Sequence, residues 1–414
     1  MKIRILLNQY RIQRIIPAVG MLQYFVANCL YSDSAETLYI ANGAFVLFAL
    51  ITVTSIMLGN GMFTIENIAT FLPFVIFGIL SAVSAINFSI AFQKAITLVV
   101  LIFMVVLINN CVKSGRLSIN IILFCLMIAG LAVAVSIVMT YGYKIIIFGI
   151  VQGIRVGADV LQLNYLGRYT YYGAVLSFYF AYYKNKPLLY LIFVVTTIVC
   201  IASGSRQAII ALIIVILMLF MMKDFSRKKI YFIIKLLIAI TVFFVIIHLP
   251  GLESIRRRVY SGLTVLFTQS SIVSSDMDRM RMIEFGFQTF IKNPIFGIGL
   301  GNIREVVGGT AISDRSYLHN NYVELLACGG IVGFIAYYYI YYRIFALIKC
   351  RVANLGWSHE TIVSLALIIG QLVLDLFAVN YYSKVQYIVF AFAFLALKYD
   401  NQINMHDSGI CSQM

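Results

Sequence analysis

A histidine, two amides and a carboxylate lie within six residues of one another, at His319, Asn320, Asn321 and Glu324. They begin a run of apolar and aromatic residues that extends to Tyr342 and is long enough to cross a bilayer. A charged side chain at the centre of a membrane helix costs roughly 2.5 to 3.5 kcal/mol, so such residues persist mainly where they have a function. The stretch therefore predicts a functional site at the start of a membrane helix.

His319 and Glu324 each admit two interpretations. A histidine at a membrane interface is often only an amphipathic side chain. At the amino-terminal end of a helix, however, the dipole disfavours imidazolium, and a neutral imidazole can accept a proton from a hydroxyl near neutral pH. Glu324 lies one helical turn further on, where it either takes part in this chemistry or is hydrogen-bonded by the neighbouring amides or by an arginine.

Arg206 is the second residue whose position indicates chemistry. It follows Ser203-Gly204-Ser205 and precedes the charge-free apolar run of residues 208–222. It could be an interfacial arginine whose stem covers apolar surface while its head reaches water. The other interpretation is an anion ligand, because a guanidinium and the free N–H groups of a helix amino terminus together form a strong phosphate site.

The sequence contains no metalloprotease, P-loop or dinucleotide-binding motif, and its seven cysteines have no metal-ligand spacing. Arginines would therefore have to neutralise the charge of a phosphate substrate. We expect a site without metal and without cofactor.

The composition places these residues in a membrane protein. Of the 414 residues, 62% are hydrophobic and 11% are charged, whereas soluble domains contain about 25% charged residues. The net charge of +15 would suggest nucleic acid in a soluble protein. Here much of it falls in short loops between apolar stretches, where it sets orientation. We therefore expect an all-α, polytopic integral membrane protein with no nucleic-acid partner.

Apolar windows of membrane-spanning length predict about twelve spans. They are residues 15–31, 38–58, 67–86, 89–110, 118–140, 165–183, 187–204, 207–222, 230–249, 319–342, 360–379 and 385–397. The distribution of Lys and Arg between alternate short loops predicts that both termini are cytoplasmic. Residues 1–249 then hold spans one to nine, residues 250–318 one large extracytoplasmic loop, residues 319–397 spans ten to twelve, and residues 398–414 a cytoplasmic tail.

Two extracytoplasmic segments carry basic residues that orientation does not explain. Residues 141–164 contain Arg155 and Asn164, and the large loop contains eight basic residues, of which six are candidates for substrate contact: Arg256, Arg257, Arg258, Arg279, Arg281 and Arg304. Within the loop, residues 278–292 alternate at helical spacing and predict a short helix at the membrane surface. Asn293-Pro294 should end this helix.

Glycines and one acid complete the polar features of the second half. Gly297, Gly299 and Gly301 predict a flexible or tightly turned backbone after the surface helix. Gly329, Gly330 and Gly333 more often allow close helix packing than contact a ligand. Asp375 lies within the expected eleventh span, where a carboxylate is costly, and has no evident partner in the sequence.

Over residues 150–345 the ordered motifs resemble the O-antigen polymerase and O-antigen ligase superfamily of bacterial polysaccharide assembly. The resemblance rests on His319-Asn320 followed by GIVG at residues 330–333, on Ser205-Arg206 at the start of a span, on Arg279 or Arg281 before PIFGIG at residues 294–299, and on Asn164 near Arg155. The pair Arg279 and Arg281 leaves the family's arginine ambiguous.

The resemblance implies a metal-independent membrane glycosyltransferase of the all-helical C type in the bacterial plasma membrane, with its active site facing outside. Its donor would be a glycan linked to undecaprenyl pyrophosphate, held by Arg206 and by Arg279 or Arg281, with Arg155 as a possible helper. His319 would contact the acceptor hydroxyl or the phosphate. Membrane lipid, a chain-length regulator and a flippase of the same pathway would be partners.

The motifs are shared by polymerases and ligases, so they leave the acceptor open. We favour a polymerase of O-antigen or capsular repeat units, with a ligase that transfers finished glycan as the alternative. A lipid-linked oligosaccharide flippase or transporter is the rival from another class. Transporters tend to show internal repeats and discontinuous helices at mid-membrane, and no repeat is visible in the sequence.

Overall fold

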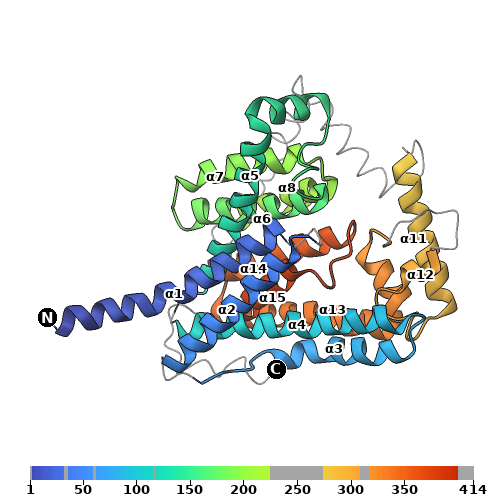
Figure 1. The fold of residues 1–414 in the computed structure, drawn as a ribbon, viewed down its shortest axis with the longest axis horizontal. Helices are drawn as coiled ribbons and strands as arrows, with labels where there is room; N and C mark the ends of the chain where they lie inside the picture. The colour runs from blue at the N-terminus through green and yellow to red at the C-terminus, as the bar shows by residue number, and fades with distance from the viewer. Residues whose placement is uncertain are drawn as a thin grey trace. The chain divides into compact units, whose positions relative to one another are not determined.

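The computed structural model describes residues 2–31, 36–58, 62–115, 117–223, 274–307 and 317–399. This part of the chain is helical and contains no strand (Figure 1). Its helices are α1 (Lys2–Tyr31), α2 (Leu38–Leu58), α3 (Ile68–Val83), α4 (Phe88–Ser114), α5 (Asn120–Gln152), α6 (Leu163–Tyr183), α7 (Leu189–Ala202), α8 (Arg206–Met222), α11 (Ser274–Lys292), α12 (Ile303–Val307), α13 (Asn321–Leu355), α14 (His359–Asp375) and α15 (Lys384–Lys398).

Each expected span that lies in the described residues coincides with a helix; the expected ninth span, residues 230–249, lies outside them. Within these described ranges, four helices are long and apolar enough to cross a membrane, namely α2, α4, α5 and α13. A bilayer core offers no hydrogen bonds to the backbone, so an apolar stretch inside it satisfies its own N–H and C=O groups as a helix. The protein is thus an all-helical membrane protein, while the count of twelve spans stays a prediction.

The chain forms two compact units. Unit 1 comprises Met1–Phe63, Asn110–Leu263 and Ser358–Gly370, and unit 2 comprises Thr64–Asn109, Thr264–Trp357 and Gln371–Met414. Arg155, Asn164 and Arg206 belong to unit 1, whereas Arg279, His319 and Glu324 belong to unit 2. The candidate residues therefore form two sets, which are described separately below.

Small residues allow the helices of unit 1 to pack closely. Helices α5, α6 and α7 contact one another, and α1 packs on α2 and α5. A β-carbon added to Gly130 in α5 would lie 2.7 Å from the backbone of Gly173 in α6, so these two backbones are nearly in contact. Because lipid tails give helices no hydrophobic reason to associate, such close packing is a main source of their attraction.

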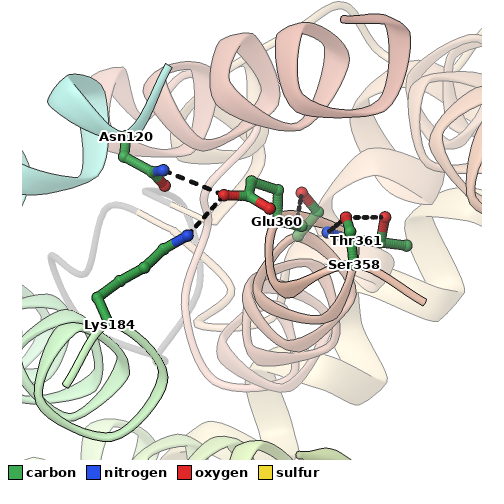
Figure 2. A network of polar contacts seen from close by, with 6 residues as sticks. Asn120, Lys184, Ser358, Glu360 and Thr361 are labelled. Atoms are coloured by element: carbon green, nitrogen blue, oxygen red, sulfur yellow. Dashed lines mark hydrogen bonds and ion pairs between the residues drawn. The ribbon is translucent and has the colours of Figure 1, made fainter. Parts of the chain in front are cut away.

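A polar network ties three helix ends of unit 1 together (Figure 2). The Glu360 carboxylate at the start of α14 accepts hydrogen bonds from Lys184 Nζ at 2.8 Å and from Asn120 Nδ2 at 3.1 Å. Lys184 follows the last residue of α6, and Asn120 is the first residue of α5. Ser358 and Thr361 pair their hydroxyls at 2.9 Å beside this group. The network fixes the start of α14 against α5 and α6.

Helix α5 differs from the expected course of the chain. Residues 141–164 were expected to be an extracytoplasmic segment after a span that ends at residue 140, but α5 continues to Gln152 beyond a break at Gly142 (φ 72°, ψ 159°). Its 33 residues correspond to about 50 Å, more than the roughly 30 Å of a bilayer core. The apolar residues 145–148 allow the helix to continue past the break.

Candidate functional site

A broken helix and a glycine-rich turn build the core of the site in unit 2. Helix α13 is interrupted at Gly330 (φ 59°, ψ −165°). Residues 293–302 form the turn that Asn293-Pro294 and three glycines predict: α11 ends at Lys292, and Gly297, Gly299 and Gly301 all have positive φ. The sequence therefore predicted both the end of the surface helix and the tight backbone that follows it.

The turn fills the break in α13 with backbone hydrogen bonds. The N–H groups of Ile298 and Gly299 donate to the carbonyls of Ala327 and Cys328, at 3.2 and 2.9 Å. In return, the N–H groups of Ile331 and Val332 donate to the carbonyls of Pro294 and Ile295, at 2.9 and 3.2 Å. The four bonds satisfy backbone groups that the interruption would otherwise leave unpaired.

The glycines are required for this close approach. A β-carbon on Gly330 would lie 2.7 Å from Phe296 N, and one on Gly297 would lie 2.6 Å from Gly329 N. Gly333 faces Phe77 of α3, which lies alongside α13 (Figure 1). The expectation that the glycines of residues 329–333 serve packing is confirmed at Gly330 and Gly333.

His319 lies in a strained turn just before α13. Its φ of 56° is in the left-handed region, which few residues other than glycine adopt. Its ring lies 4.2 Å from that of Tyr317, centroid to centroid. Asn320 is the N-cap: its side-chain oxygen accepts from Val323 N at 3.0 Å, and its Nδ2 donates to Leu376 O at 3.2 Å. Asn320 thus fixes both the helix start and its attachment to the turn after α14.

Asn321 is held in a buried network around Asp375, the acid that has no evident partner in the sequence. Asp375 is 0% exposed and accepts from Asn380 Nδ2 at 2.7 Å, Tyr341 OH at 3.2 Å, Asn321 Nδ2 at 3.3 Å and Tyr338 OH at 3.4 Å. Asn321 Oδ1 in turn accepts from the N–H groups of Asn380 and Tyr381. These bonds hold the first residues of α13 in place. A direct contact of Asn321 with substrate stays a prediction.

Glu324 lies in the first turn of α13 and is buried, with 2% of its surface exposed. Its Oε2 accepts a hydrogen bond from the backbone N–H of Leu318 at 2.8 Å. The side-chain amides of Asn320 and Asn321 donate to Leu376 O and to Asp375, respectively, and not to this carboxylate.

One face of α11 packs on the start of α13. Met282 is buried, and a β-carbon on Gly286 would clash with the side chains of Leu318 and Val323. Arg279 lies three residues before Met282 and so shares this face, whereas Arg281 is exposed. Residues two apart on a helix do not face the same way. The geometry thus favours Arg279 over Arg281 as the arginine near His319.

Two further sets of loop residues can be placed. Arg304 lies on α12 and is exposed, whereas Arg256, Arg257 and Arg258 lie outside the described residues. At the start of α11, Asp276 and Asp278 have the spacing of a paired-carboxylate metal site. The side chains of both residues lie outside the part of the chain that the structure describes.

In unit 1, Arg155, Asn164 and the serine turn before Arg206 come together. Arg155 Nε donates to Ser203 O at 2.9 Å, and its Nη2 donates to Asn164 Oδ1 at 3.4 Å. Ser205 is the N-cap of α8, and Arg206 is the first residue of that helix. The expectation that Arg206 opens a helix is confirmed. Arg155 stabilises the turn that positions Arg206, and the amino terminus of a helix is suited to an anion.

Sequence reasoning missed three residues of these two sets. Lys94 in α4 lies over the ring of Tyr382, with its Nζ 3.8 Å from the ring centroid. Asn302 Oδ1 accepts from Asn87 N at 2.6 Å and so fastens the glycine turn to the start of α4. Arg168, one helical turn after Asn164, is buried within α6 beside Tyr165. An isolated charge in an apolar helix is a detectable signal for Lys94 and Arg168.

Fold and composition define an integral membrane protein whose polar residues gather at helix starts. Residues 191–338 match the family model described as O-antigen ligase, which confirms the resemblance to the O-antigen polymerase and ligase superfamily of membrane glycosyltransferase-like enzymes. The matched segment contains Arg206, Arg279 and His319, whereas Arg155 and Asn164 precede it. No curated protein matches the chain.

Proposed function

We propose that the protein is a membrane glycosyltransferase that transfers a glycan from undecaprenyl pyrophosphate to a sugar hydroxyl on the outer face of the bacterial plasma membrane. The observation that carries the proposal is the family match over residues 191–338, which contains the arginine at the start of α8, the arginines of α11 and the histidine before α13. The superfamily acts on lipid-linked glycans in a membrane pathway. An all-helical membrane fold with Arg206 at the start of α8 suits such a substrate.

Arginines bind the pyrophosphate in this proposal. Arg206 combines a guanidinium with the amino terminus of α8, and both favour a phosphate anion. Arg155 holds the serine turn before it through Ser203 O, so it acts on the donor through this turn. Arg279 is the preferred arginine of α11, because it lies on the face that packs near His319. Neutralised by arginine, the pyrophosphate becomes a better leaving group.

His319 contacts either the acceptor hydroxyl or the phosphate in this proposal. The acceptor hydroxyl attacks the anomeric carbon, a new carbon–oxygen bond forms, and the bond from that carbon to pyrophosphate breaks, which inverts the anomer. His319 either accepts the hydroxyl proton as a neutral imidazole or binds the phosphate. Its place at the amino-terminal end of α13 supports the neutral form, since the helix dipole disfavours a positive charge there.

Our preferred acceptor is a second lipid-linked repeat unit, which makes the protein a polymerase of O-antigen or capsular polysaccharide. The second candidate is a ligase that transfers finished glycan to a lipid core or another acceptor. It is favoured by the description of the matched family as O-antigen ligase. Both candidates use the same donor and leaving group, so the acceptor distinguishes them.

Reconstitution tests the proposal. Purified protein in liposomes is given an undecaprenyl-pyrophosphate-linked repeat unit in the presence of EDTA, and the products are resolved on a gel. Arg206→Ala and His319→Ala are run beside it, with Arg343→Ala of α13 as a matched arginine control. The polymerase predicts a ladder that survives EDTA and Arg343→Ala and is lost in the other two variants.

Other outcomes distinguish the alternatives. Transfer only when a lipid core acceptor is supplied, as a single product without a ladder, identifies the ligase. A ladder that EDTA abolishes contradicts metal independence and directs attention to Asp276 and Asp278. Movement of intact substrate across the bilayer without a new glycosidic bond refutes the enzyme in favour of a transporter, a class for which the breaks in α5 and α13 would then be relevant.

A further inference from the structure

Helix α5 is longer than a membrane crossing requires. Its first part, from Asn120 to the break at Gly142, is about 33 Å long, and a bilayer core is roughly 30 Å thick. Tyr143 and Lys144 follow the break, and tyrosine rings and lysine side chains are typical of the membrane interface. The second part of α5, residues 143–152, therefore follows a complete crossing and is not needed for it.

This second part nevertheless exposes apolar side chains. Ile147 and Val151 lie one turn apart on the same side of the helix, with 53% and 46% of their surface exposed. Ile154, just after the helix, is 55% exposed, whereas Ile146 and Gly149 are buried. Ile147, Val151 and Ile154 form the apolar strip of α5. Adjoining exposed apolar residues of this kind mark an interaction surface.

The chain reverses at the end of this strip. Gly153 has a φ of 72° and ends α5, and Ile154 N donates to Gly149 O at 2.8 Å. A β-carbon on Gly149 would lie 2.4 Å from Val156 Cγ2, so the residues after the reversal pack back on the last turns of α5. Val156 N in turn donates to Ala202 O at 3.0 Å. These contacts attach the end of the strip to the end of α7.

Arg155 places a positive charge at this end of the strip. It directly follows Ile154 and is exposed. Its Nε donates to Ser203 O and its Nη2 to Asn164 Oδ1. Both acceptors are neutral groups, so these bonds orient the guanidinium without cancelling its charge. Arg206, three residues after Ser203, begins α8. An apolar strip with cationic groups at one end complements a lipid that has an anionic head group.

We propose that the apolar strip of α5 binds the polyprenyl chain of the donor whose pyrophosphate lies at Arg206. The inference rests on the proposed function and deepens it, because it gives a site to the lipid part of the substrate. A polyprenyl chain is joined directly to its pyrophosphate, so it has to leave the arginines along the apolar surface that adjoins them. The strip adjoins Arg155, and contact with the chain removes its side chains from polar surroundings. Ordinary membrane phospholipid is the competing occupant.

Displacement of a quenching lipid tests the site without any need for activity. Trp357 is the one tryptophan of the chain, so Trp357→Phe gives a background without tryptophan fluorescence. In this background Ile147→Trp reports on the strip. Val135→Trp, at a residue 41% exposed in the first part of α5, reports on bulk lipid. Both proteins are placed in nanodiscs of brominated phosphatidylcholine, which quenches tryptophan on contact. Added undecaprenyl pyrophosphate should relieve the quenching of Ile147→Trp and leave that of Val135→Trp unchanged.

Two additions link the relief of quenching to the head group and to the chain. Arg155→Ala should raise the concentration of undecaprenyl pyrophosphate needed for half of the relief at least about tenfold, because it removes a charge beside the pyrophosphate. Arg343→Ala of α13 should not. Inorganic pyrophosphate should give no relief, since it has no chain. Relief at both tryptophan positions, relief at neither, or relief by inorganic pyrophosphate overturns the strip as the site of the chain.

Donors of different chain length give a kinetic readout. Ile147→Ser combined with Val151→Ser should raise KM for the undecaprenyl donor at least about tenfold and change KM little for a donor with two isoprene units, which covers less of the strip. Val53→Ser with Met57→Ser, an exposed apolar pair of the same spacing on α2, is the control. Selective relief of quenching without transfer activity would count against the proposed function and support the strip. Transfer activity without selective relief, or equal losses for both donors, overturns the strip.

Discussion

Replacing Gly330 by alanine tests whether the inserted turn holds α13 in its broken form. Gly330 and Gly142 have closely similar backbone angles, with φ of 59° and 72° and ψ of −165° and 159°. Both lie in a region that is essentially restricted to glycine, and a residue with a β-carbon there costs about 1 to 3 kcal/mol. They differ in their surroundings: a β-carbon on Gly142 meets nothing within 4 Å, whereas one on Gly330 meets the backbone of Ile295 and Phe296.

The difference between the two variants isolates the turn. Gly142→Ala should lower the free energy of unfolding by the strain alone, about 1 to 3 kcal/mol. Gly330→Ala has the same strain and also pushes the turn away, which endangers four backbone hydrogen bonds worth about 0.5 to 1.5 kcal/mol each. Its total loss should therefore be about 3 to 9 kcal/mol, and it should abolish activity if the protein folds at all.

Thermal unfolding in detergent, followed by size-exclusion chromatography, measures the effect. A loss of 1 kcal/mol lowers the midpoint of unfolding by about 2 to 4 °C in domains of about 150 to 250 residues, so Gly330→Ala should fall well below Gly142→Ala. Gly43→Ala in α2 has open space at its β-carbon and should leave the midpoint unchanged or raise it. Equal midpoints for Gly330→Ala and Gly142→Ala would show that the turn does not support α13.

Three further predictions follow from single contacts. Arg279→Ala should reduce glycan transfer at least about tenfold and Arg281→Ala much less, because charge-assisted phosphate contacts are worth about 1.5 to 3 kcal/mol and only Arg279 shares the packed face of α11. Steady-state rates of both variants measure the difference, and equal losses would contradict the prediction. Lys184→Met should lower the free energy of unfolding by no more than about 1 kcal/mol, because the ion pair of Lys184 with Glu360 is partly exposed. Its midpoint of thermal unfolding should lie slightly below that of Lys186→Met, and a large drop would indicate a stronger pair. Asp375→Asn should lower the free energy of thermal unfolding by about 2 to 4 kcal/mol, because it removes a charged acceptor from four donors. The control Asp159→Asn, at an exposed residue, should cost less. No change in stability for Asp375→Asn would mean that the network does not depend on this charge.

Helix positions were predictable from the sequence because they depend on local composition. The run of residues 208–222 has no charge and has to be helical in a bilayer, and Asn293-Pro294 ends α11 wherever the helix lies. The continuation of α5 to Gln152 was not predicted. Residues 141–164 contain polar and charged side chains that suggest a loop, yet Gly142 only breaks the helix, which resumes over the apolar residues that follow.

The candidate site was predictable in its members and less so in its contacts. The spacing of Arg155 and Asn164 before a span drew attention to both, and the structure joins them by a hydrogen bond. The choice between Arg279 and Arg281 needed the packed face of α11, which Met282 and Gly286 define. Sequence spacing alone treats both arginines alike, because each precedes the glycine turn at nearly the same distance.

The sequence by itself determined that this is an all-helical membrane protein, which polar residues lie at the starts of its helices, and which family it resembles. These follow from composition, from the length of apolar runs and from motifs, all of which are local properties of the chain. Tertiary structure alone decided that Asp375 accepts a hydrogen bond from Asn321, that Asn302 accepts one from Asn87 and that the turn at Pro294 fills the break at Gly330. Each of these contacts joins residues far apart in sequence. Hydrogen bonds and charge interactions are stronger in the low-dielectric interior, but only after packing has brought the partners together.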